Sequence, residues 1–135
     1  MVDNTSSASA NYEEHESEIE ACKYIFMDDL TMLEEKPYKF EVILNSSSES
    51  SENHLSLKMT LELPDAYPNE VPAFRIKNLS PDIIDNNQVL NFEKIVLKKA
   101  EASIGTPMIY EMCEALREII TEMNDKVLNK LKEIQ

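Results

Sequence analysis

Apolar and polar residues alternate most regularly in residues 55–63. Leucine or methionine fills every second position there, and serine, lysine, threonine and glutamate fill the four positions between them. A period of two is typical of a strand with one buried face. Residues 38–44 and 73–77 alternate in the same way. The pattern therefore predicts three strands, each with one face toward a core.

Apolar residues recur at spacings of three and four in other segments, which predicts amphipathic helices. The first helix is expected to begin at Glu13 and to end between residues 26 and 29. A second helix is expected over about residues 85–102. Its predicted apolar stripe consists of Val89, Leu90, Phe92, Ile95, Val96 and Ala100. These helices would cover the apolar face of the strands.

A third helix is predicted over residues 107–134. Gly105 separates it from the second helix, with Thr106 at the cap position and Pro107 at the first helical position. At ~1.5 Å per residue it would be about 40 Å long, more than a small sheet can cover. Residues 126–135 are therefore expected to project, and either pack at the core's edge or begin a coiled coil or docking helix.

The length of 135 residues, with 42% of them hydrophobic, predicts one domain with one core. We expect this domain to cover residues 13–125. Residues 1–12 are small and polar, and are predicted to be a flexible tail. No leader is recognised, and no apolar run approaches the ~18 residues that a membrane span needs. A soluble, cytoplasmic chain is expected.

Acidic residues outnumber basic ones by 26 to 13, which gives a formal net charge of −13. Without a cationic stripe to release counterions, nucleic acid and anionic membranes are poor partners. A basic protein surface is the natural complement, because opposite fields speed encounter. The alternative interpretation is that the acidity only keeps the protein soluble.

Residues that carry chemistry are few. Cys22 and Cys113 lie far apart without CxxC spacing, and are expected to be buried thiols in a reducing compartment. His15 and His54 are isolated and expected to be exposed to solvent. A single glycine leaves no Gly-rich phosphate loop. The sequence therefore predicts no metal site, no cofactor and no catalytic residue.

The segment YPNEVP at residues 67–72 separates the last two predicted strands. Proline fixes φ and removes a backbone donor, so Pro68 and Pro72 exclude a helix or a central strand and predict a fixed turn. Tyr67 is expected to pack its ring under the turn and to hydrogen-bond through its hydroxyl. We therefore predict a structural role for the turn.

Two motifs indicate a family. The pattern YPxxxPxhxh, where h is apolar, is matched by Tyr67, Pro68, Pro72, Phe74 and Ile76. The run E-x-E-A-L-x-x-I-[YF] in the first helix is matched by Glu18, Glu20, Ala21, Ile25 and Phe26, with Cys22 in place of leucine. Over about residues 13–125 the chain resembles the RWD domain. The resemblance implies an α+β sandwich, similar to ubiquitin-conjugating enzymes, with a helix, three or four antiparallel strands and two helices in that order.

Within that family, residues 99–110 are most similar to the small RWD proteins that partner developmentally regulated GTP-binding proteins. This resemblance implies binding to the ribosome-associated HEAT-repeat activator of the starvation-sensing translation-factor kinase. It also implies binding to a GTPase through regions beyond these residues. The expected role is a non-catalytic adaptor in translation control and the amino-acid starvation response.

The likeness to conjugating enzymes makes ubiquitin chemistry the alternative. Such an enzyme needs an exposed cysteine after the strand that follows the turn. Residues 78–91 contain neither cysteine nor histidine. The chain is therefore predicted not to be an enzyme. The alternative function is that of a ubiquitin-pathway cofactor, or of a conjugating-enzyme-like protein that lacks the catalytic cysteine.

The candidate partner-binding residues are six carboxylates of the last two predicted helices, expected to meet Arg or Lys on a partner. They are Glu93, Glu101, Glu111, Glu114, Glu118 and Glu122. The Ser-rich residues 45–53 predict a mobile hairpin tip. Ser46 lies three residues before Glu49, which would suit an acid-directed kinase.

Overall fold

A computed structural model describes the backbone of residues 3–35, 37–46 and 55–134, and the side chains of residues 13–35, 37–46 and 55–126. The elements are α1 (Asp3–Phe26), the 3₁₀ turn η1 (Met27–Asp29), β1 (Leu30–Glu35), β2 (Tyr38–Asn45), β3 (Ser56–Glu62), β4 (Ala73–Asn78), α2 (Asn86–Ala102) and α3 (Ile109–Ile134). The α+β class is confirmed, as are the three predicted strands.

The four strands form one antiparallel sheet in the order β1-β2-β3-β4, so each strand pairs with its neighbour in sequence. β1 was not among the strands read from alternation. Only Leu30 of this edge strand is buried, and its register with β2 shifts between Met32 and Glu34. A bulged edge strand with one buried side chain leaves no regular period to detect.

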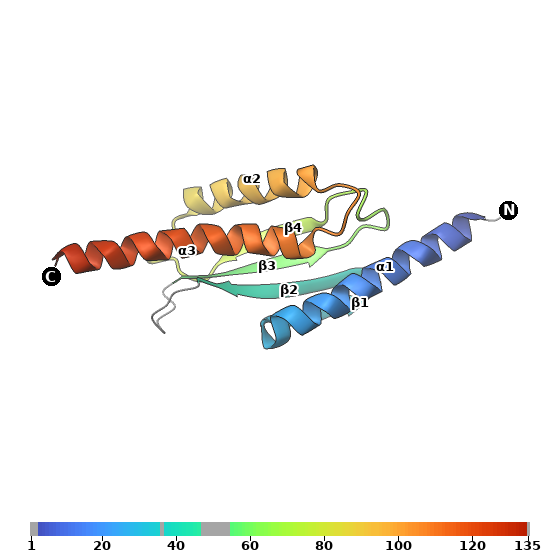
Figure 1. Cartoon of the computed structure of the whole chain (residues 1–135), viewed down its shortest axis with the longest axis horizontal. Coiled ribbons are helices and arrows are strands. Elements are labelled where there is room, and N and C mark those ends of the chain that lie inside the picture. The colour runs from blue at the N-terminus through green and yellow to red at the C-terminus, as the bar shows by residue number, and fades with distance from the viewer. Residues whose placement is uncertain (1–2, 36, 47–54, 135) are drawn as a thin grey trace.

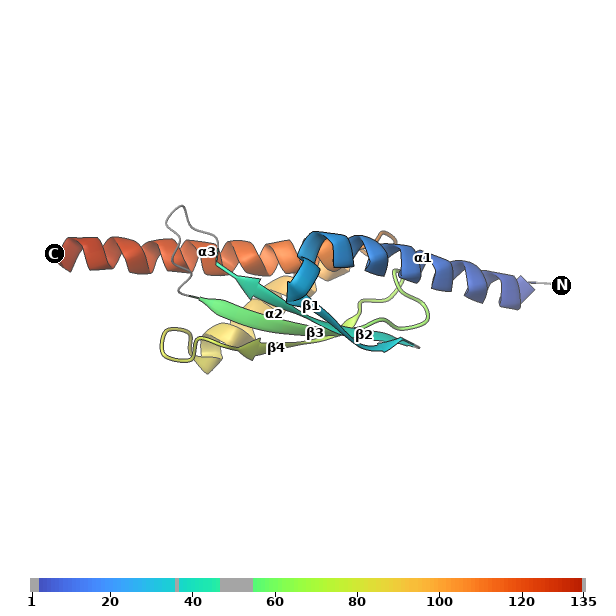
Figure 2. The same ribbon diagram turned by 90° about the horizontal axis from the view of Figure 1, so that it is seen from below.

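The helices lie on one face of the sheet. Figure 1 shows α3 packed on the sheet and running roughly along the strands, with α2 beside it toward β4 and α1 at the β1 end. Turned by 90°, α1 and α3 lie together on one side of β2 and β3, whose other side carries no helix in the described part of the chain (Figure 2). The last turns of α3 extend past the strands (Figure 1).

The core lies between the sheet and these helices. The inward side chains of β2 and β3 are fully buried, as the alternation predicts. They include Phe40, Val42, Leu57, Met59 and Leu61. Ile19 and Cys22 of α1 and Met112, Leu116 and Ile120 of α3 are buried against them. Each such aliphatic side chain contributes roughly 1.5–3 kcal/mol by leaving water.

The first helix begins earlier than predicted, at Asp3 and not at Glu13. The segment expected to be a flexible tail is therefore helical from Asp3 onward. Composition predicted a tail because few of its residues are apolar. Once the packed turns around Ile19 and Cys22 have formed, however, each added residue gains a backbone hydrogen bond at little cost.

The second helix has the predicted bounds. Asp85 caps it, accepting from the backbone N–H of Gln88 at 2.7 Å, while the Gln88 side chain accepts from the Asp85 N–H at 2.8 Å. Half of the predicted apolar stripe is buried, namely Phe92, Val96 and Ala100. Leu90 and Ile95 are exposed, contrary to the prediction. The buried positions recur every four residues, so α2 contacts the core along a narrower line than its apolar content suggested.

Candidate functional site: the Tyr67 turn and the groove between α2 and α3

The turn at residues 67–72 joins β3 to β4 and also touches the loop before α3. The Tyr67–Pro68 peptide bond is cis. The Tyr67 N–H donates to the Pro64 carbonyl at 3.0 Å, and the Gly105 N–H donates to the Pro68 carbonyl at 2.9 Å. Gly105 has a φ of 100°, a conformation that side-chain-bearing residues rarely adopt. The turn is therefore hydrogen-bonded to the loop between α2 and α3.

The Tyr67 hydroxyl joins α1 to the start of α3. It lies 2.7 Å from each carboxylate oxygen of Glu18, to which it donates, and accepts from the Met108 N–H at 2.7 Å. Glu18 Oε2 in turn accepts from the Ile109 N–H at 3.1 Å. The first N–H groups of a helix have no partner within the helix, and a carboxylate there also complements the helix dipole. Glu18 and Tyr67 together therefore cap α3.

Glu18 and Tyr67 cap α3 in place of Thr106, the residue that the sequence predicts as the cap. Thr106 was the expected cap of the third helix, but its hydroxyl donates to the Ser103 carbonyl at 2.8 Å. α3 begins at Ile109. A cap supplied by side chains from residues 18 and 67 leaves no local sequence signal, because cap motifs are recognised within one turn of the helix start.

His15 belongs to the same network, contrary to the prediction that it is exposed. Its side chain is 4% exposed, and its Nε2 lies 2.7 Å from the Tyr67 carbonyl oxygen. The imidazole meets the Tyr67 ring edge-on, with centroids 5.5 Å apart. Its position three residues before Glu18 places both side chains on one face of α1. His54 lies outside the described residues.

Burial sets the protonation chemistry of this network, which we call the Tyr67 network (His15, Glu18, Tyr67 and the N–H groups of Met108 and Ile109). Loss of water around Glu18 raises the pKa of its carboxyl above the ordinary 4.5, against the opposing effect of hydrogen bonds from Tyr67 and Ile109. Burial, and then the nearby Glu18, raise the pKa of the Tyr67 hydroxyl. The Tyr67 hydroxyl therefore stays protonated and links α1 to α3 through its hydrogen bonds.

Both cysteines are buried thiols, as predicted. Burial raises the pKa of Cys22 to about 12, and burial likewise raises the pKa of Cys113. A thiol acts as a nucleophile through its thiolate, which a raised pKa makes scarce. Neither side chain is placed to accept ubiquitin as a thioester in this conformation. Within the described residues, no group of three or more His, Cys, Asp or Glu could hold a metal ion.

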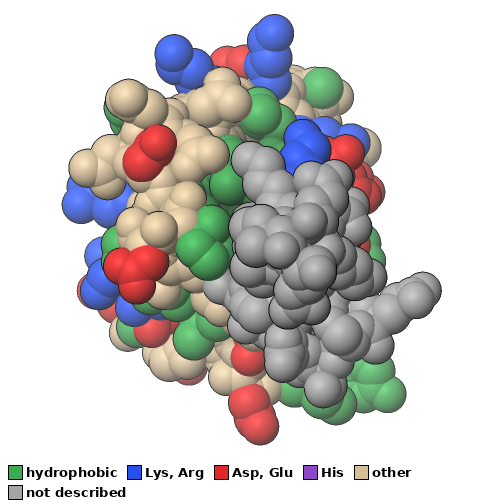
Figure 3. Space-filling model, turned by 90° about the vertical axis from the view of Figure 1, so that its left-hand side faces the viewer, with side chains coloured by type: hydrophobic (Ala, Val, Ile, Leu, Met, Phe, Trp, Pro, Cys, Tyr) green, Lys and Arg blue, Asp and Glu red, His purple; other side chains and the backbone are tan. Residues whose placement is uncertain are grey.

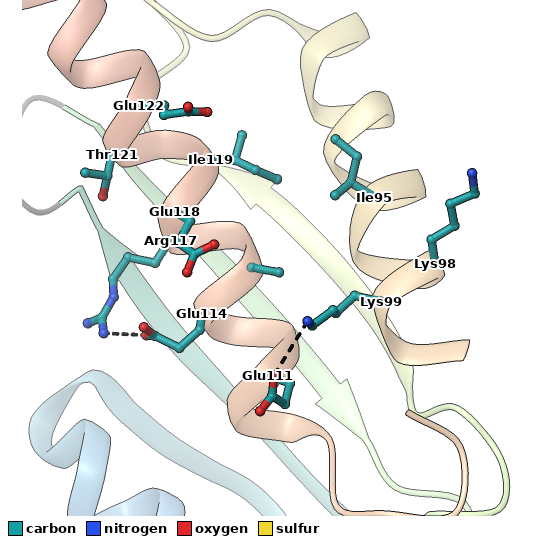
Figure 4. A pocket seen from close by; sticks show the side chains of 11 residues that line it. Ile95, Lys98, Lys99, Glu111, Glu114, Arg117, Glu118, Ile119, Thr121 and Glu122 are labelled. Atoms are coloured by element: carbon teal, nitrogen blue, oxygen red, sulfur yellow. Dashed lines mark ion pairs between the residues drawn. The ribbon is translucent and has the colours of Figure 1, made fainter. Parts of the chain in front are cut away.

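A groove of about 1040 Å³ runs between α2 and α3. Ile95 of α2 and Ile119 of α3 face one another across it (Figure 4). Lys98 and Lys99 lie on the α2 side. Acidic residues lie on the α3 side, so the groove has an apolar centre between oppositely charged rims.

Four of the six predicted partner-binding carboxylates line this groove: Glu111, Glu114, Glu118 and Glu122. Glu93 and Glu101 lie on α2 outside its lining. Glu111 pairs across the groove with Lys99 at 3.7 Å, and Glu114 pairs with Arg117 on the side of α3 away from α2 (Figure 4). Sequence spacing placed these carboxylates on α3 but could not tell which of them have internal partners.

Glu118 and Glu122 are the acidic pair of the groove that remains available. Both are exposed, and neither forms an ion pair or hydrogen bond within the described residues. They are four residues apart on one helix face, where like charges repel by about 0.2–0.5 kcal/mol. Two unpaired carboxylates beside an apolar centre can accept Arg or Lys from a bound polypeptide.

Ser46, the candidate phosphorylation site, is 1% exposed. Its backbone N–H donates to the Leu55 carbonyl at 2.9 Å, continuing the pairing of β2 and β3. A kinase would have to open this end of the hairpin to reach the hydroxyl. Glu49 and the rest of the Ser-rich tip lie outside the described residues.

The described chain also contains no helix long and apolar enough to cross a membrane.

The class of protein follows from three features described above. They are an antiparallel sheet covered by helices, a YPxxxP turn bonded to the first helix, and an exposed groove. Together they define a protein-binding module of the α+β class. The family model of the RWD domain matches residues 13–120. The chain belongs to this family, whose members are protein-interaction modules.

Two relatives and one solved structure are similar to this chain over most of its length. The bovine E3 ubiquitin-protein ligase RNF25 is 28% identical over 114 residues, which cover 80% of this chain and 24% of that protein. The fission yeast eIF-2-alpha kinase GCN2 is 25% identical over 127 residues, covering 89% of this chain and 8% of the kinase. The chain thus spans a quarter or less of either relative's length.

The solution structure of the RWD domain of mouse GCN2 superimposes with a TM-score of 0.73 at 20% identity. The match covers 84% of this chain and 86% of that domain. It confirms the predicted RWD fold, with its four antiparallel strands.

Proposed function

We propose that this chain is a non-catalytic adaptor that binds a basic segment of a protein partner in the groove between α2 and α3. The observation that carries the proposal is the pair Glu118 and Glu122, exposed and without an internal partner beside Ile119. A partner could place Arg or Lys on this rim and an apolar side chain between Ile95 and Ile119. Protein interfaces usually have buried apolar anchor residues at the centre and charged or polar residues at the rim.

The class of partner follows from the family resemblance. We propose that the chain acts in the cytoplasm, in translation control and the amino-acid starvation response, by binding a ribosome-associated HEAT-repeat regulator. A developmentally regulated GTPase would bind through other regions of the protein. Similarity to a kinase named for translation factor eIF-2-alpha supports this assignment, as does the net charge of −13, which favours a basic surface.

The test is binding of the HEAT-repeat regulator to the full chain, followed by calorimetry at rising salt. The double variant Glu118→Lys/Glu122→Lys should weaken binding by roughly 10-fold or more, because two attractive contacts become repulsive. The matched control is Glu93→Lys/Glu101→Lys, which changes the net charge equally on α2 outside the groove lining. It should change affinity less than about threefold. Equal losses in the two variants would mean that only overall charge matters, and would contradict the groove assignment.

A second function is favoured by the similarity to RNF25, named an E3 ubiquitin-protein ligase. In this case the module would serve the ubiquitin pathway as a recruiting domain, and the groove would bind a conjugating enzyme or a ligase substrate. An activating-enzyme assay separates recruitment from catalysis. We expect no ubiquitin thioester on Cys22 or Cys113, because both thiols are buried with raised pKa values. A thioester on either residue would make the chain an enzyme and overturn both functions proposed here.

A further inference from the structure

The face of the sheet turned away from the helices is formed by alternate residues of the strands, because successive side chains of a strand point to opposite sides. We call it the open face. From β2, β3 and β4 it displays Lys39, Glu41, Ile43, Asn45, Ser56, Lys58, Thr60, Glu62, Ala73, Arg75 and Lys77, whose strand neighbours point into the core. This surface plays no part in the groove between α2 and α3.

Three cations gather on the β3–β4 side of the open face. Lys58 lies directly opposite Lys77 in the strand register, and Arg75 lies opposite Thr60, one step along the same face. Lys and Arg side chains are visible along the left-hand margin of Figure 3, the side of the molecule turned away from α3. We call Lys58, Arg75 and Lys77 the cationic cluster.

The cluster is only partly neutralised. Lys58 forms an ion pair with Glu41 at 3.5 Å. Arg75 and Lys77 form no ion pair or hydrogen bond within the described residues, and both are exposed. Within the part of the chain that the structure describes, two of the 13 basic residues therefore stand unpaired on one face of β4, in a protein with 26 acidic residues.

The arrangement is unfavourable for the isolated fold. Like charges directly opposite one another across two strands destabilise a sheet, and Lys58 and Lys77 occupy such positions. An acidic residue at position 77 would remove this repulsion. Positions that break a local rule of stability are where functional surfaces are expected.

The surface beside the cluster is shaped to receive side chains. A hollow of about 500 Å³ is lined by residues that include Arg75, Thr60, Lys39 and Leu33. Glu62, which lies opposite Lys39 in the strand register, also lines it. Ile43, which is 37% exposed, lies opposite Lys58 and supplies an apolar contact.

We propose that the open face is a second docking surface, on which the cationic cluster binds an acidic segment of a protein. The occupant is identified by charge complementarity, with carboxylates meeting Arg75 and Lys77 and an apolar side chain meeting Ile43 or Leu33. A short acidic segment meets the local cluster alone, whereas a long phosphate polymer would also meet the repulsion of a chain with a net charge of −13. The module then binds a basic partner through one face and an acidic one through the other.

The experiment titrates the ¹⁵N-labelled full chain with a short Glu-rich peptide carrying one leucine, and follows backbone amide shifts. Shifts should map to β3 and β4 and weaken with salt. Arg75→Glu/Lys77→Glu should lower affinity for this peptide roughly 10-fold, as expected when two attractive charges become repulsive. The control is Lys94→Glu/Lys126→Glu, which makes the same change in net charge at exposed helix positions and should leave affinity within about twofold.

Lys77→Glu alone separates binding from folding. It should raise the midpoint of thermal unfolding, because Lys58 would then face an opposite charge, while lowering affinity for the peptide. A Lys-rich peptide of equal length should shift residues of α2 and α3 and leave the open face unchanged, which keeps this test independent of the groove. The proposal is overturned if the Glu-rich peptide shifts no residue of β3 or β4, if both double variants lose affinity equally, or if an RNA oligonucleotide or anionic vesicle binds there more tightly.

Discussion

The Tyr67 network and the groove between α2 and α3 both include residues of α3, but their polar groups differ in burial and in hydrogen bonding. At the start of α3, Tyr67 and Glu18 are withdrawn from water and bonded to one another and to two backbone N–H groups. About three turns further on, Glu118 and Glu122 are exposed and unpaired within the described residues. Buried and satisfied polar groups hold a fold together. Exposed, unsatisfied ones beside apolar side chains are available to a partner.

The difference explains why the family motif is a poor guide to binding. The motif residues Tyr67, Pro68, Pro72, Phe74 and Ile76 position the turn and the core. Almost any alteration of such a buried network costs stability, so its residue types are closely specified. A binding rim can be built from many arrangements of carboxylates. The recognisable part of the sequence therefore reports the scaffold, whereas the binding residues proposed above carry no motif.

The largest effect is expected for Tyr67→Phe. The variant leaves the Met108 N–H without its acceptor and removes the Tyr67 donor to Glu18, which keeps only the Ile109 N–H. It should lower the free energy of unfolding by about 2–3 kcal/mol. Denaturant unfolding measures the loss. Affinity for the partner, measured on folded protein, should stay within about twofold because the groove is untouched. Tyr110→Phe is the control, since Tyr110 is 43% exposed, and it should cost less than about 0.5 kcal/mol.

A second test concerns the pH dependence of the network. Because burial raises the pKa of Glu18 above 4.5, the folded state holds this proton more tightly than the unfolded state. The resulting stabilisation is fully present below pH 4.5 and is lost as the pH rises through the raised pKa. Stability relative to Glu18→Gln, which cannot titrate, should therefore fall as the pH rises from below 4.5 to neutral.

Unfolding curves of both proteins across that range give the answer. If the stability of the unmodified chain relative to Glu18→Gln rises with pH instead, the hydrogen bonds from Tyr67 and Ile109 outweigh burial. The network would then be built around an ionised carboxylate. Glu122→Gln is a suitable control, because Glu122 is exposed and unpaired within the described residues.

The smallest effect is expected in the groove itself. Glu118→Gln removes repulsion from Glu122 one turn away, and should raise the free energy of unfolding by about 0.2–0.5 kcal/mol. The same variant should weaken binding of a basic partner. A gain in stability with a loss of affinity would distinguish a binding residue from a structural one. If stability falls instead, Glu118 belongs with the scaffold and the contrast between the two regions fails.

Much of the fold could be predicted because its patterns are local. The alternation in residues 55–63 matches β3 and its flanks, and Asp85 with Gln88 marks the start of α2. What could not be predicted depends on distant contacts. β1 has too few buried residues to show a period, and the cap of α3 comes from Glu18 and Tyr67.

In the candidate site too, features set by distant contacts could not be predicted from the sequence. Placement of carboxylates on α3 could be read from spacing, because residues four apart share a helix face. Their pairing could not, since the partner of Glu111 is Lys99 on another helix. His15 was expected to be exposed because nothing near it in sequence is a partner. Its partner is the carbonyl of Tyr67, 52 residues away.

The cap of α3 also bears on how the chain is made. Synthesis proceeds from the N-terminus, and the sheet joins only neighbours in sequence, so its strands can pair as each one emerges. Glu18 and Tyr67, however, have no N–H groups to bind until Met108 and Ile109 have left the ribosome. In a nascent chain halted before that point, the Glu18 carboxylate and the Tyr67 hydroxyl would lack the two N–H groups that they bind in the complete domain. The network can therefore form only after the start of α3 has been synthesised, and we expect it to be among the last contacts of the domain to form.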